Sequence, residues 1–302
     1  METTAETTKT QGKIGNTGHL SRLRLQRALG RSLIYFVLAL GGLVFIIPFY
    51  WVIIASFKTP SELRSIPPTW WPQTFTLANY PEVWRAEFAR YFLNSFIYSG
   101  GSTLVIIITS SLIGYVIVKD KSRFGNVVFW FILAASMVPF VTFLLPLFNV
   151  LLRIQNWFGI PMVNTYWGMI MPFVVFPFGV FLMRQAMFSV PDDLLDAARI
   201  DGASEMGIYW RIVVPLIRHN LAALAIIVFI FKYDDLLWPL VVAQRPEMYP
   251  VTVGLVEYVG QFFIEYHLFT TAAVLAIIPI FLLYLVLQRF IIEGIATQGL
   301  KG

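Results

Sequence analysis

Cysteine and charge are both scarce in this sequence. None of the 302 residues is a cysteine, which excludes disulfides, thiolate nucleophiles and cysteine-ligated metals. Only 13% of the residues are charged and 58% are hydrophobic, whereas a soluble domain carries roughly 25% charge. A water-soluble globule has too small an interior to bury so much apolar surface. The composition therefore excludes soluble, disordered and disulfide-rich secreted proteins, and it predicts an all-α, polytopic membrane protein.

Long apolar runs are abundant in the sequence. A bilayer core about 30 Å thick needs about 20 helical residues for each crossing. Six runs are long enough, and only the fifth contains formal charges. Because Arg153 alone separates the third run from the fourth, their boundary depends on the turn signal at residues 155–161. The six predicted transmembrane helices lie within residues 32–57, 91–118, 124–152, 154–183, 219–242 and 268–288.

Lysine and arginine are distributed unevenly between the predicted loops. If both termini face the cytoplasm, 15 of the 22 basic residues fall in inner segments and six in outer segments. Basic residues favour the cytoplasmic side of the cell membrane, so we expect both termini there. Residues 1–30 then form a cytoplasmic N-terminal tail, and residues 31–302 form the transmembrane domain with an inner loop at 184–218. The proline- and tryptophan-rich residues 61–87 predict an ordered outer loop at the membrane interface.

Motifs for catalysis, metal binding and nucleic-acid binding are missing. The three histidines are widely separated, and no His-Glu-x-x-His pattern occurs. No phosphate-binding loop is present, so ATP hydrolysis would require another chain. The net charge is +5, but the basic residues are spread between apolar runs instead of forming a patch. We therefore expect no catalytic residue, metal or cofactor in this chain, no nucleic-acid partner, and a lipid bilayer around it.

Prolines lie inside the predicted transmembrane helices. Each proline removes a backbone donor and tends to kink its helix. Such kinks persist in lipid where neighbouring helices or a water-filled cavity satisfy the freed carbonyl groups. These prolines are therefore either tolerated within a packed bundle or signs that the bundle surrounds a path. They are Pro48, Pro139, Pro146, Pro172, Pro177, Pro239 and Pro279.

The longest polar inner segment, residues 184–218, has the pattern of two short helices. Pro191 and the two aspartates after it fit a helix start, because proline suits the first turn and carboxylates favour the positive end of the helix dipole. Gly202 supplies a turn, and Ser204 is the expected N-cap of a second helix.

The first of these helices has one apolar face. Leu194, Ala197 and Ala198 share that face at helical spacing. Because two of the three residues are small, the face allows close approach to a partner groove.

This segment resembles the conserved cytoplasmic loop of ABC importer permeases. The family pattern is Glu-Ala-Ala, three residues, Gly, nine residues, Ile, any residue, Leu-Pro. Here Asp196 takes the place of the Glu and Val214 that of the Leu. The matching positions are Asp196-Ala197-Ala198, Gly202, Ile212 and Val214-Pro215. Further segments resemble the carbohydrate-uptake, maltose-permease-like branch of the family, namely Pro48-Phe49-Tyr50-Trp51, Ser56-Phe57-Lys58-Thr59-Pro60, Asn79-Tyr80, Phe92-Leu93-Asn94-Ser95 and Gln288-Arg289-Phe290.

The resemblance implies a fold and a role for the loop. The fold would be the type I ABC importer permease architecture with six transmembrane helices. The loop at residues 190–215 would form a coupling helix that docks in a groove of a cytoplasmic ATPase subunit, whereas the alternative is a solvated amphipathic connector. The residues expected to carry the docking are Asp196, Ala197, Ala198, Asp201, Gly202, Ala203, Ile212 and Pro215.

The resemblance also implies the other parts of a transporter. These are a second permease subunit that completes a heterodimeric path, two ATPase subunits that hold ATP and magnesium, and an extracytoplasmic solute-binding protein. Transport of a sugar would then proceed by alternating access. This chain would be a transport subunit and not an enzyme.

Charged residues inside the fifth predicted helix mark a second candidate site. Charges at that depth are costly and normally face the protein interior or a cavity. In one hypothesis Asp234 or Asp235 lines the sugar path. Tyr233 or Trp238 would then stack on a sugar ring. In the other hypothesis Lys232 and Asp235, three residues apart, form an ion pair that fixes helix packing.

The intramembrane charges also leave an alternative function open. An ion- or proton-coupled secondary transporter would use Lys232, Asp234 and Asp235 for coupling, with no dependence on an ATPase. Asn94 is a further candidate for the path, although an interhelix hydrogen bond equally explains it. Several aromatic residues either contact solute or only pack against helices and lipid. They are Phe140, Phe143, Phe148, Tyr166, Trp167, Phe173 and Phe176.

Overall fold

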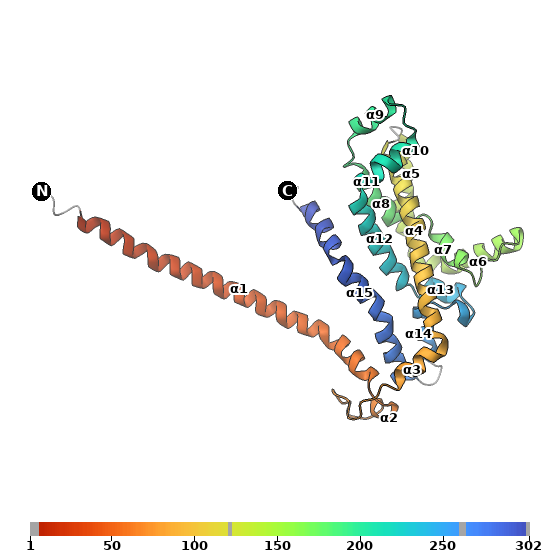
Figure 1. The fold of residues 1–302 in the computed structure, drawn as a ribbon, viewed down its shortest axis with the longest axis horizontal. Coiled ribbons are helices and arrows are strands. Elements are labelled where there is room, and N and C mark those ends of the chain that lie inside the picture. The colour runs from red at the N-terminus through yellow and green to blue at the C-terminus, as the bar shows by residue number, and fades with distance from the viewer. Residues whose placement is uncertain (1–5, 120–122, 260–263, 300–302) are drawn as a thin grey trace.

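The computed structural model describes residues 6–119, 123–259 and 264–299, and most of these residues are helical (Figure 1). Within them no strand occurs, apart from an isolated bridge between Val259 and Ile264. The predicted all-α fold class is therefore confirmed. In chain order the elements are α1 (Glu6–Ser56), α2 (Pro60–Leu63), α3 (Asn79–Val83), η1 (Trp84–Phe88), α4 (Ala89–Lys119), α5 (Arg123–Ser136), α6 (Phe140–Phe158), α7 (Tyr166–Ile170), η2 (Met171–Phe173), α8 (Pro177–Met187), α9 (Asp192–Ile200), α10 (Glu205–Ile208), η3 (Tyr209–Val213), α11 (Val214–Leu216), α12 (Arg218–Tyr233), α13 (Leu237–Val242), η4 (Pro246–Met248), α14 (Val251–Glu257) and α15 (Tyr266–Gly299).

The apolar helices agree with the predicted number of membrane crossings. Two bent pairs each supply one possible crossing: α7–η2 with α8, bent by 50°, and α10–α11 with α12, bent by 79°. Together with the unbroken helices they give up to six crossings in the described part of the chain. The unbroken segments that are long and apolar enough are Gly30–Ser56, Ala89–Lys119, Phe140–Phe158 and Tyr266–Val286.

The third predicted crossing is divided into two helices. α5 ends at Ser136 and α6 begins at Phe140, with Pro139 as its N-cap residue. Proline has no N–H to continue the hydrogen-bond ladder of the preceding helix, which explains the break. The prediction of one helix over residues 124–152 is therefore wrong. At its other end α6 continues past Arg153 and stops before Gly159, which has φ +68°. The chain therefore turns within the expected segment 155–161, but only from residue 159, and the predicted start of the fourth crossing at residue 154 is wrong.

α4 is the central helix of the bundle and packs along both α8 and α12. Ile106, Met183 and Leu224 are among the buried residues between these helices. α4 and α8 approach so closely that a Cβ atom on Gly114 would lie 3.0 Å from the Cβ of Met183. Small residues permit such close contact between membrane helices. This packing fixes α8 and α12 on α4, and it therefore determines where their broken ends meet.

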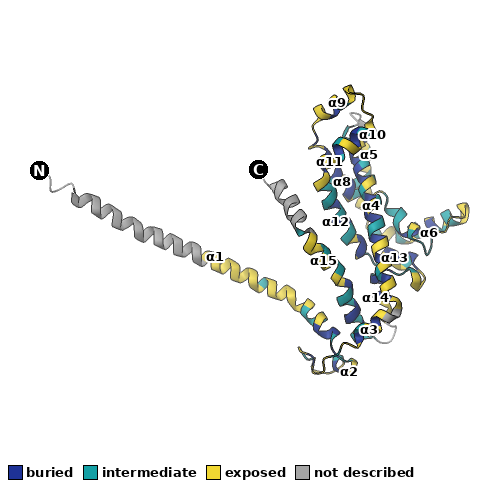
Figure 2. Cartoon of the chain, in the orientation of Figure 1, coloured by how far each residue is buried: buried dark blue, intermediate teal, exposed yellow. Residues whose placement is uncertain are grey.

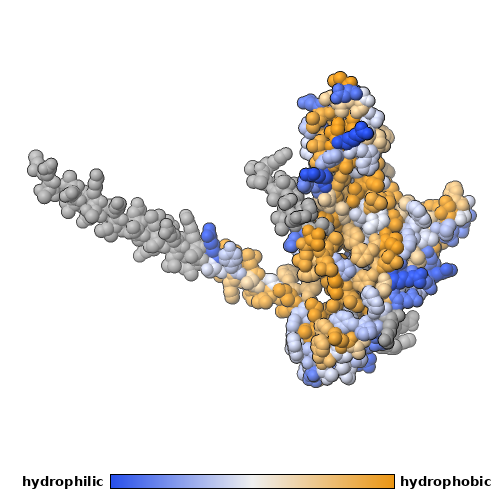
Figure 3. Space-filling model, in the orientation of Figure 1, coloured by the Kyte–Doolittle hydropathy of each residue, from blue (hydrophilic) through white to orange (hydrophobic). Residues whose placement is uncertain are grey.

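α1 and α6 lie mostly outside this core. α1 contacts α15 close to Ser56 and then runs away from the bundle (Figure 1). Between Leu33 and Ile53 most of its large apolar side chains are exposed, as Figures 2 and 3 show. α6 projects from the side of the bundle, and Leu151 is its one buried residue. Apolar surfaces of this extent indicate contact with lipid or with another membrane chain.

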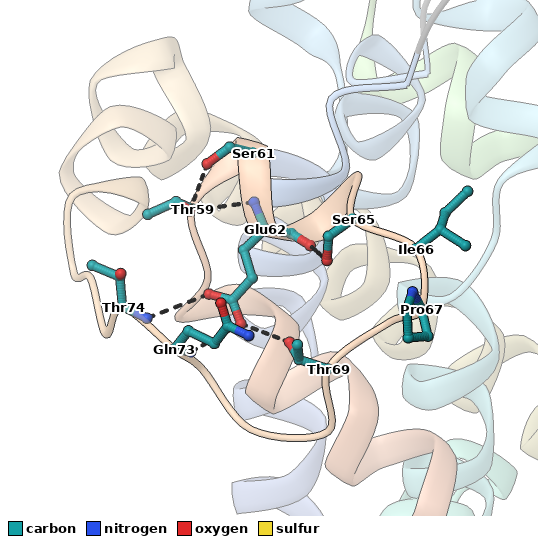
Figure 4. Close-up of a pocket in the computed structure, with 9 residues that line it drawn as sticks. All are labelled: Thr59, Ser61, Glu62, Ser65, Ile66, Pro67, Thr69, Gln73 and Thr74. Carbon is teal, nitrogen blue, oxygen red and sulfur yellow. Dashed lines mark hydrogen bonds between the residues drawn. The ribbon is translucent and has the colours of Figure 1, made fainter.

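The loop between α1 and α3, which the sequence predicts on the outer side, folds around the carboxylate of Glu62 (Figure 4). Its Oε1 accepts hydrogen bonds from Thr69 Oγ1 at 2.6 Å and Gln73 N at 2.9 Å. Its Oε2 accepts from Thr74 N at 3.4 Å, and the buried Lys58 lies nearby, donating to the Thr69 carbonyl oxygen. Burial raises the pKa of Glu62, but the hydrogen bonds and the charge of Lys58 outweigh this effect and hold the pKa below its ordinary value.

We predict that Glu62 stabilises the outer loop at neutral pH but not in acid. Because its pKa is lower in the folded loop, the stabilisation is complete above about pH 4.5, the ordinary value, and is lost as pH falls through the folded pKa. At neutral pH, amide hydrogen exchange at Gln73 and Thr74 should be several-fold faster in Glu62→Gln than in the unchanged protein. A difference that persists in strong acid, or an equal effect of the exposed control Glu82→Gln, would contradict this account.

Candidate functional site

A cavity of about 900 Å³ lies where three of the predicted crossings break. One break separates α5 from α6 at residues 137–139, another separates η2 from α8 at 174–176, and the third separates α12 from α13 at 234–236. Residues of all three breaks line the cavity. The breaks are distant in sequence, and the packing of α8 and α12 on α4 brings two of them together.

Three of the intramembrane prolines, Pro139, Pro172 and Pro177, line this cavity. A helix that breaks inside a membrane leaves backbone groups without their helical partners, and these groups need protein or water. The arrangement supports the hypothesis that the bundle surrounds a path. The alternative of merely tolerated prolines still applies to those away from the cavity.

Lys232 and Asp235 form an ion pair in the cavity wall. Lys232 Nζ lies 3.3 Å from Asp235 Oδ2, and their side chains are 6% and 17% exposed. The hydroxyl of Tyr98, on α4, donates to the same Oδ2 at 2.7 Å and accepts from Lys232 Nζ at 3.3 Å. The ammonium group also lies over the ring of Phe173, 3.2 Å from its centroid. The pair therefore connects the end of α12 to α4 and η2.

Asp235 also holds the chain on the far side of the break. Its Oδ1 accepts from the backbone N–H of Trp238 at 3.5 Å, and its carbonyl oxygen accepts from the hydroxyl of Thr252 at 2.9 Å. One residue thus joins α4, α12, α13 and α14. The contacts of Asp235 therefore agree with the hypothesis of an ion pair that fixes helix packing.

Asp234 has a different environment from its neighbour. It is exposed and lines the cavity. Its backbone N–H donates to the Ile230 carbonyl oxygen, but its carboxylate has no hydrogen bond or ion pair among the residues that the structure describes. The environment of Asp234 therefore agrees with the hypothesis of a carboxylate that faces a path.

The other three candidates for the path do not line the cavity. Tyr233 is 2% exposed and donates to the Ala276 carbonyl oxygen. Trp238 is fully buried, and its Nε1 donates to the carbonyl oxygens of Gly168 and Met169. Stacking of either ring on a sugar is not supported in this conformation.

Asn94 is also buried and fully engaged within the chain. Its Nδ2 donates to the carbonyl oxygens of Glu247 and Tyr249, and its Oδ1 accepts from the hydroxyl of Tyr166. It therefore fixes the segment before α14 to α4, as expected for an interhelix amide. Among the aromatic candidates, the cavity is lined by Phe140, Phe143, Phe173 and Phe176, and not by Phe148, Tyr166 or Trp167.

Tyr98 was not predicted as part of the site. It lies four residues after Asn94, so both point from the same face of α4. A second polar side chain, four residues after Asn94 in an apolar helix, is the sequence feature that could have identified Tyr98. For metals, no group of three or more suitable ligands occurs in the described ranges.

The loop at residues 184–218 has the local structure that its sequence predicts. α9 begins at Asp192 after Pro191, which is the N-cap residue instead of the first helical residue. Gly202 has φ +80°, a conformation that favours glycine. Ser204 caps α10, with its hydroxyl accepting from Gly207 N at 3.2 Å. The predicted turn and the predicted N-cap are both confirmed.

One leucine anchors α9 to the bundle. Leu195 is fully buried in a cluster with Met187, Ile208 and Tyr209. The predicted apolar face points elsewhere, because Leu194 is 48% exposed. Ala197 is exposed and Ala198 is half-buried. Leu194 and Ala197 therefore remain open to a partner, while the residue that attaches the helix was missed by the sequence analysis.

Ion pairs fix the angle between α9 and α10. Arg199 pairs with Asp196 and with Glu205, each at 2.7 Å, and the Tyr115 hydroxyl donates to Glu205 at 2.7 Å. The hydrogen bonds from Arg199 and Tyr115 lower the pKa of Glu205, so this carboxyl stays ionised. Lys119, at the end of α4, pairs with an aspartate at the start of α9. These contacts hold the loop as one unit with α4.

The expected docking residues lie together at one end of the bundle, on and beside α9 and α10 (Figure 1). Arg199 already forms an ion pair with the carboxylate of Asp196, and the side chain of Asp196 remains 53% exposed. Ile212 is half-buried against the core. The exposed members are Asp196, Ala197, Asp201, Gly202, Ala203 and Pro215.

Comparison with known proteins places this arrangement in a family. Residues 106–296 match the family described as "Binding-protein-dependent transport system inner membrane component". The chain belongs to this family. The matched region contains the cavity-lining breaks and the whole loop at residues 184–218. Its members are transport components of the membrane, so this chain is a permease subunit and not an enzyme.

Several curated relatives are similar over most of their length. The arabinooligosaccharides transport system permease protein AraQ of Bacillus subtilis (strain 168) is 30% identical over 265 residues, covering 86% of this chain and 92% of AraQ. The sulfoquinovosyl glycerol transport system permease protein SmoH of Agrobacterium fabrum is 31% identical, with coverage of 88% and 91%. The sn-glycerol-3-phosphate transport system permease protein UgpE of Escherichia coli (strain K12) is 32% identical, with coverage of 87% and 94%.

Solved structures agree with the fold. A bacterial ABC transporter involved in the import of the acidic polysaccharide alginate aligns with a TM-score of 0.69 at 19% identity, over 85% of this chain and 94% of that chain. A bacterial alginate ABC transporter in complex with an alginate pentasaccharide-bound periplasmic protein aligns with a TM-score of 0.63 at 17% identity, over 88% and 98%. The ABC importer permease architecture expected from the resemblance is confirmed.

We predict unequal effects on stability from removing the two neighbouring carboxylates. Asp235→Ala leaves Lys232 buried without its counter-ion, and breaking a buried ion pair in this way typically costs about 3–5 kcal/mol. Its midpoint of thermal unfolding in detergent should fall well below that of the unchanged complex. Asp234→Ala removes an exposed, unpartnered carboxylate, so its midpoint should change little. Equal midpoints for the two variants would contradict the different environments of the two residues.

Proposed function

We propose that this chain forms half of the translocation path of an ATP-driven, binding-protein-dependent sugar importer. The observation that carries the proposal is the cavity at the three helix breaks, with an exposed carboxylate, among aromatic side chains, at its wall. Carboxylates accept hydrogen bonds from hydroxyl groups, and aromatic rings pack against the apolar faces of sugars. The names of AraQ, SmoH and UgpE, which refer to oligosaccharides and glycerol derivatives, support a polyhydroxylated solute.

The cytoplasmic loop connects two helices that line the cavity. α8 begins at the cavity with Pro177 and leads into α9, while α10 and α11 lead into α12, which returns to the cavity at Lys232. α9 is attached to this frame through Leu195 and through its ion pairs with α4 and α10. An ATPase subunit that moves α9 therefore moves both helices.

Docking of the ATPase subunit would use the exposed part of the loop. Leu194 and Ala197 provide an apolar anchor and a site of close approach, the pattern of a helix that lies in a groove. The coupling set predicted from the resemblance includes Ala197 and further residues of the same loop. It comprises Asp196, Ala197, Ala198, Asp201, Gly202, Ala203, Ile212 and Pro215.

The other components belong to the same proposal. A second permease subunit covers the open part of the cavity and completes a heterodimeric path, and two ATPase subunits bind ATP and magnesium. An extracytoplasmic solute-binding protein delivers the sugar. Both termini lie in the cytoplasm, on the side of α9. Lys119, Arg184 and Arg199 at that end of the bundle support this orientation.

Alternating access sets an energetic requirement for this assembly. ATP and the loaded binding protein must favour the outward-facing state over the inward-facing state, because ligands with equal affinity for both states shift nothing. The loop transmits the preference of the ATPase subunits, and the cavity responds because α8 and α12 end there.

A matched pair of glycine variants tests the coupling role. Gly202 and Gly159 both have positive φ, and at both positions a Cβ would meet nothing within 4 Å. Valine therefore introduces the same backbone strain at each, in the coupling loop or at the end of α6. In the reconstituted complex, Gly202→Val should lower solute-stimulated ATP hydrolysis at least about tenfold, or release the ATPase subunits, whereas Gly159→Val should retain both.

The same assay separates the importer from the alternative. Normal transport by Gly202→Val would contradict the coupling role of the loop. Uptake in proteoliposomes that contain no ATPase subunit would favour the secondary transporter, with Lys232, Asp234 and Asp235 in the coupling role.

A further inference from the structure

The geometry points to Asp234 as the residue that makes this path select uncharged solutes over anionic ones. The inference rests on the proposed function and deepens it by naming the class of solute. The solutes in the names of the relatives differ in charge. Arabinooligosaccharides, named for AraQ, carry no charge, whereas the solutes named for SmoH and UgpE carry a sulfonate and a phosphate.

The charges that line the cavity do not cancel. Among its lining residues only Lys232, Asp234 and Asp235 are charged. Asp235 neutralises Lys232 at 3.3 Å, and the ammonium group is buried beneath the ring of Phe173 and beside the hydroxyl of Tyr98. Asp234 is left without a counter-charge in the described chain, so the net charge that faces a solute is negative.

The rest of the wall strengthens the effect of this carboxylate. Phe140, Phe143, Phe173 and Phe176 line the same cavity and contribute apolar surface. In an apolar surrounding the field of a charge is screened less than in water. An anionic solute is therefore repelled by Asp234. An uncharged sugar is instead bound, because its hydroxyl groups donate hydrogen bonds to the Asp234 carboxylate and the faces of its ring pack against the phenyl groups.

The absence of native cysteine allows the potential in the cavity to be measured directly. Leu237 lines the cavity three residues from Asp234 and is 44% exposed, so Leu237→Cys places one thiol there. In the complete complex this thiol reacts with a positively charged and a negatively charged methanethiosulfonate of similar size. The ratio of the two rates is divided by the same ratio for a small thiol in solution, which removes the intrinsic difference in reactivity between the two reagents and gives a corrected ratio. Mass spectrometry of this chain alone excludes labelling of the other subunits.

We expect the corrected ratio to favour the positive reagent by about tenfold or more, as found for charged clefts with apolar walls. Adding Asp234→Asn should reduce the ratio at least about threefold. Asp193→Asn, which removes an exposed carboxylate on α9 at the end of the bundle, should leave the ratio unchanged (Figure 1). A ratio that favours the negative reagent, or that Asp234→Asn does not change, would overturn the inference.

A second measurement uses two solutes with the same sugar backbone, one anionic and one uncharged. Trigalacturonic acid and its trimethyl ester, added at millimolar concentration, compete with an uncharged thiol reagent for Leu237→Cys. The ester should slow labelling at least about threefold more than the acid, and Asp234→Asn should remove this difference. Equal protection by both probes, or protection by neither, would overturn the inference. Both labelling results are independent of ATP, so the failure of ATP-driven uptake would overturn the proposed function without changing the measured charge preference.

Discussion

A helix that breaks inside a bilayer must satisfy its freed backbone groups with protein or water, because lipid offers them no partner. Here three breaks meet this requirement at one cavity of about 900 Å³. The position of the cavity depends on the close packing of α8 and α12 against α4. Gly114 of α4 allows the backbones of α4 and α8 to approach. Three of the intramembrane prolines, four phenylalanines and the intramembrane charges lie where these breaks converge.

Two adjacent aspartates divide the roles that such a site requires. Asp235 joins four helices and neutralises Lys232, so it maintains the shape of the break. Asp234 is turned to the cavity and has no structural contact for its carboxylate among the described residues. At the other end of α8 and α12, Leu195 and Arg199 hold the loop at residues 184–218 to the same helices. The cavity and the loop are therefore connected by two helices, α8 and α12, and each of these helices is held by contacts at both of its ends.

Much of this structure was predictable where the signal is local or long. The apolar runs indicated the crossings, and Gly202 and Ser204 indicated the turn and the cap from their own chemistry. The break before α6 was not predicted, because hydropathy continues across Pro139 and prolines are common in membrane helices. Helical spacing indicated the pairing of Lys232 with Asp235 and the separate direction of Asp234, but not the contact of Asp235 with Tyr98, which lies 137 residues away in sequence. Leu195 was missed because the buried face of α9 is set by the core on which it packs.

The central claim is that the cavity at the helix breaks is the path that the ATPase subunits open and close through the loop. State-dependent labelling of single cysteines tests it most directly. Phe143→Cys lies on the cavity wall, and Leu145→Cys lies on the same helix but does not line the cavity. In the reconstituted complex, the labelling rate of Phe143→Cys should change several-fold between nucleotide-free and ATP-trapped states, while that of Leu145→Cys stays constant. Equal rates for Phe143→Cys in both states would contradict the account.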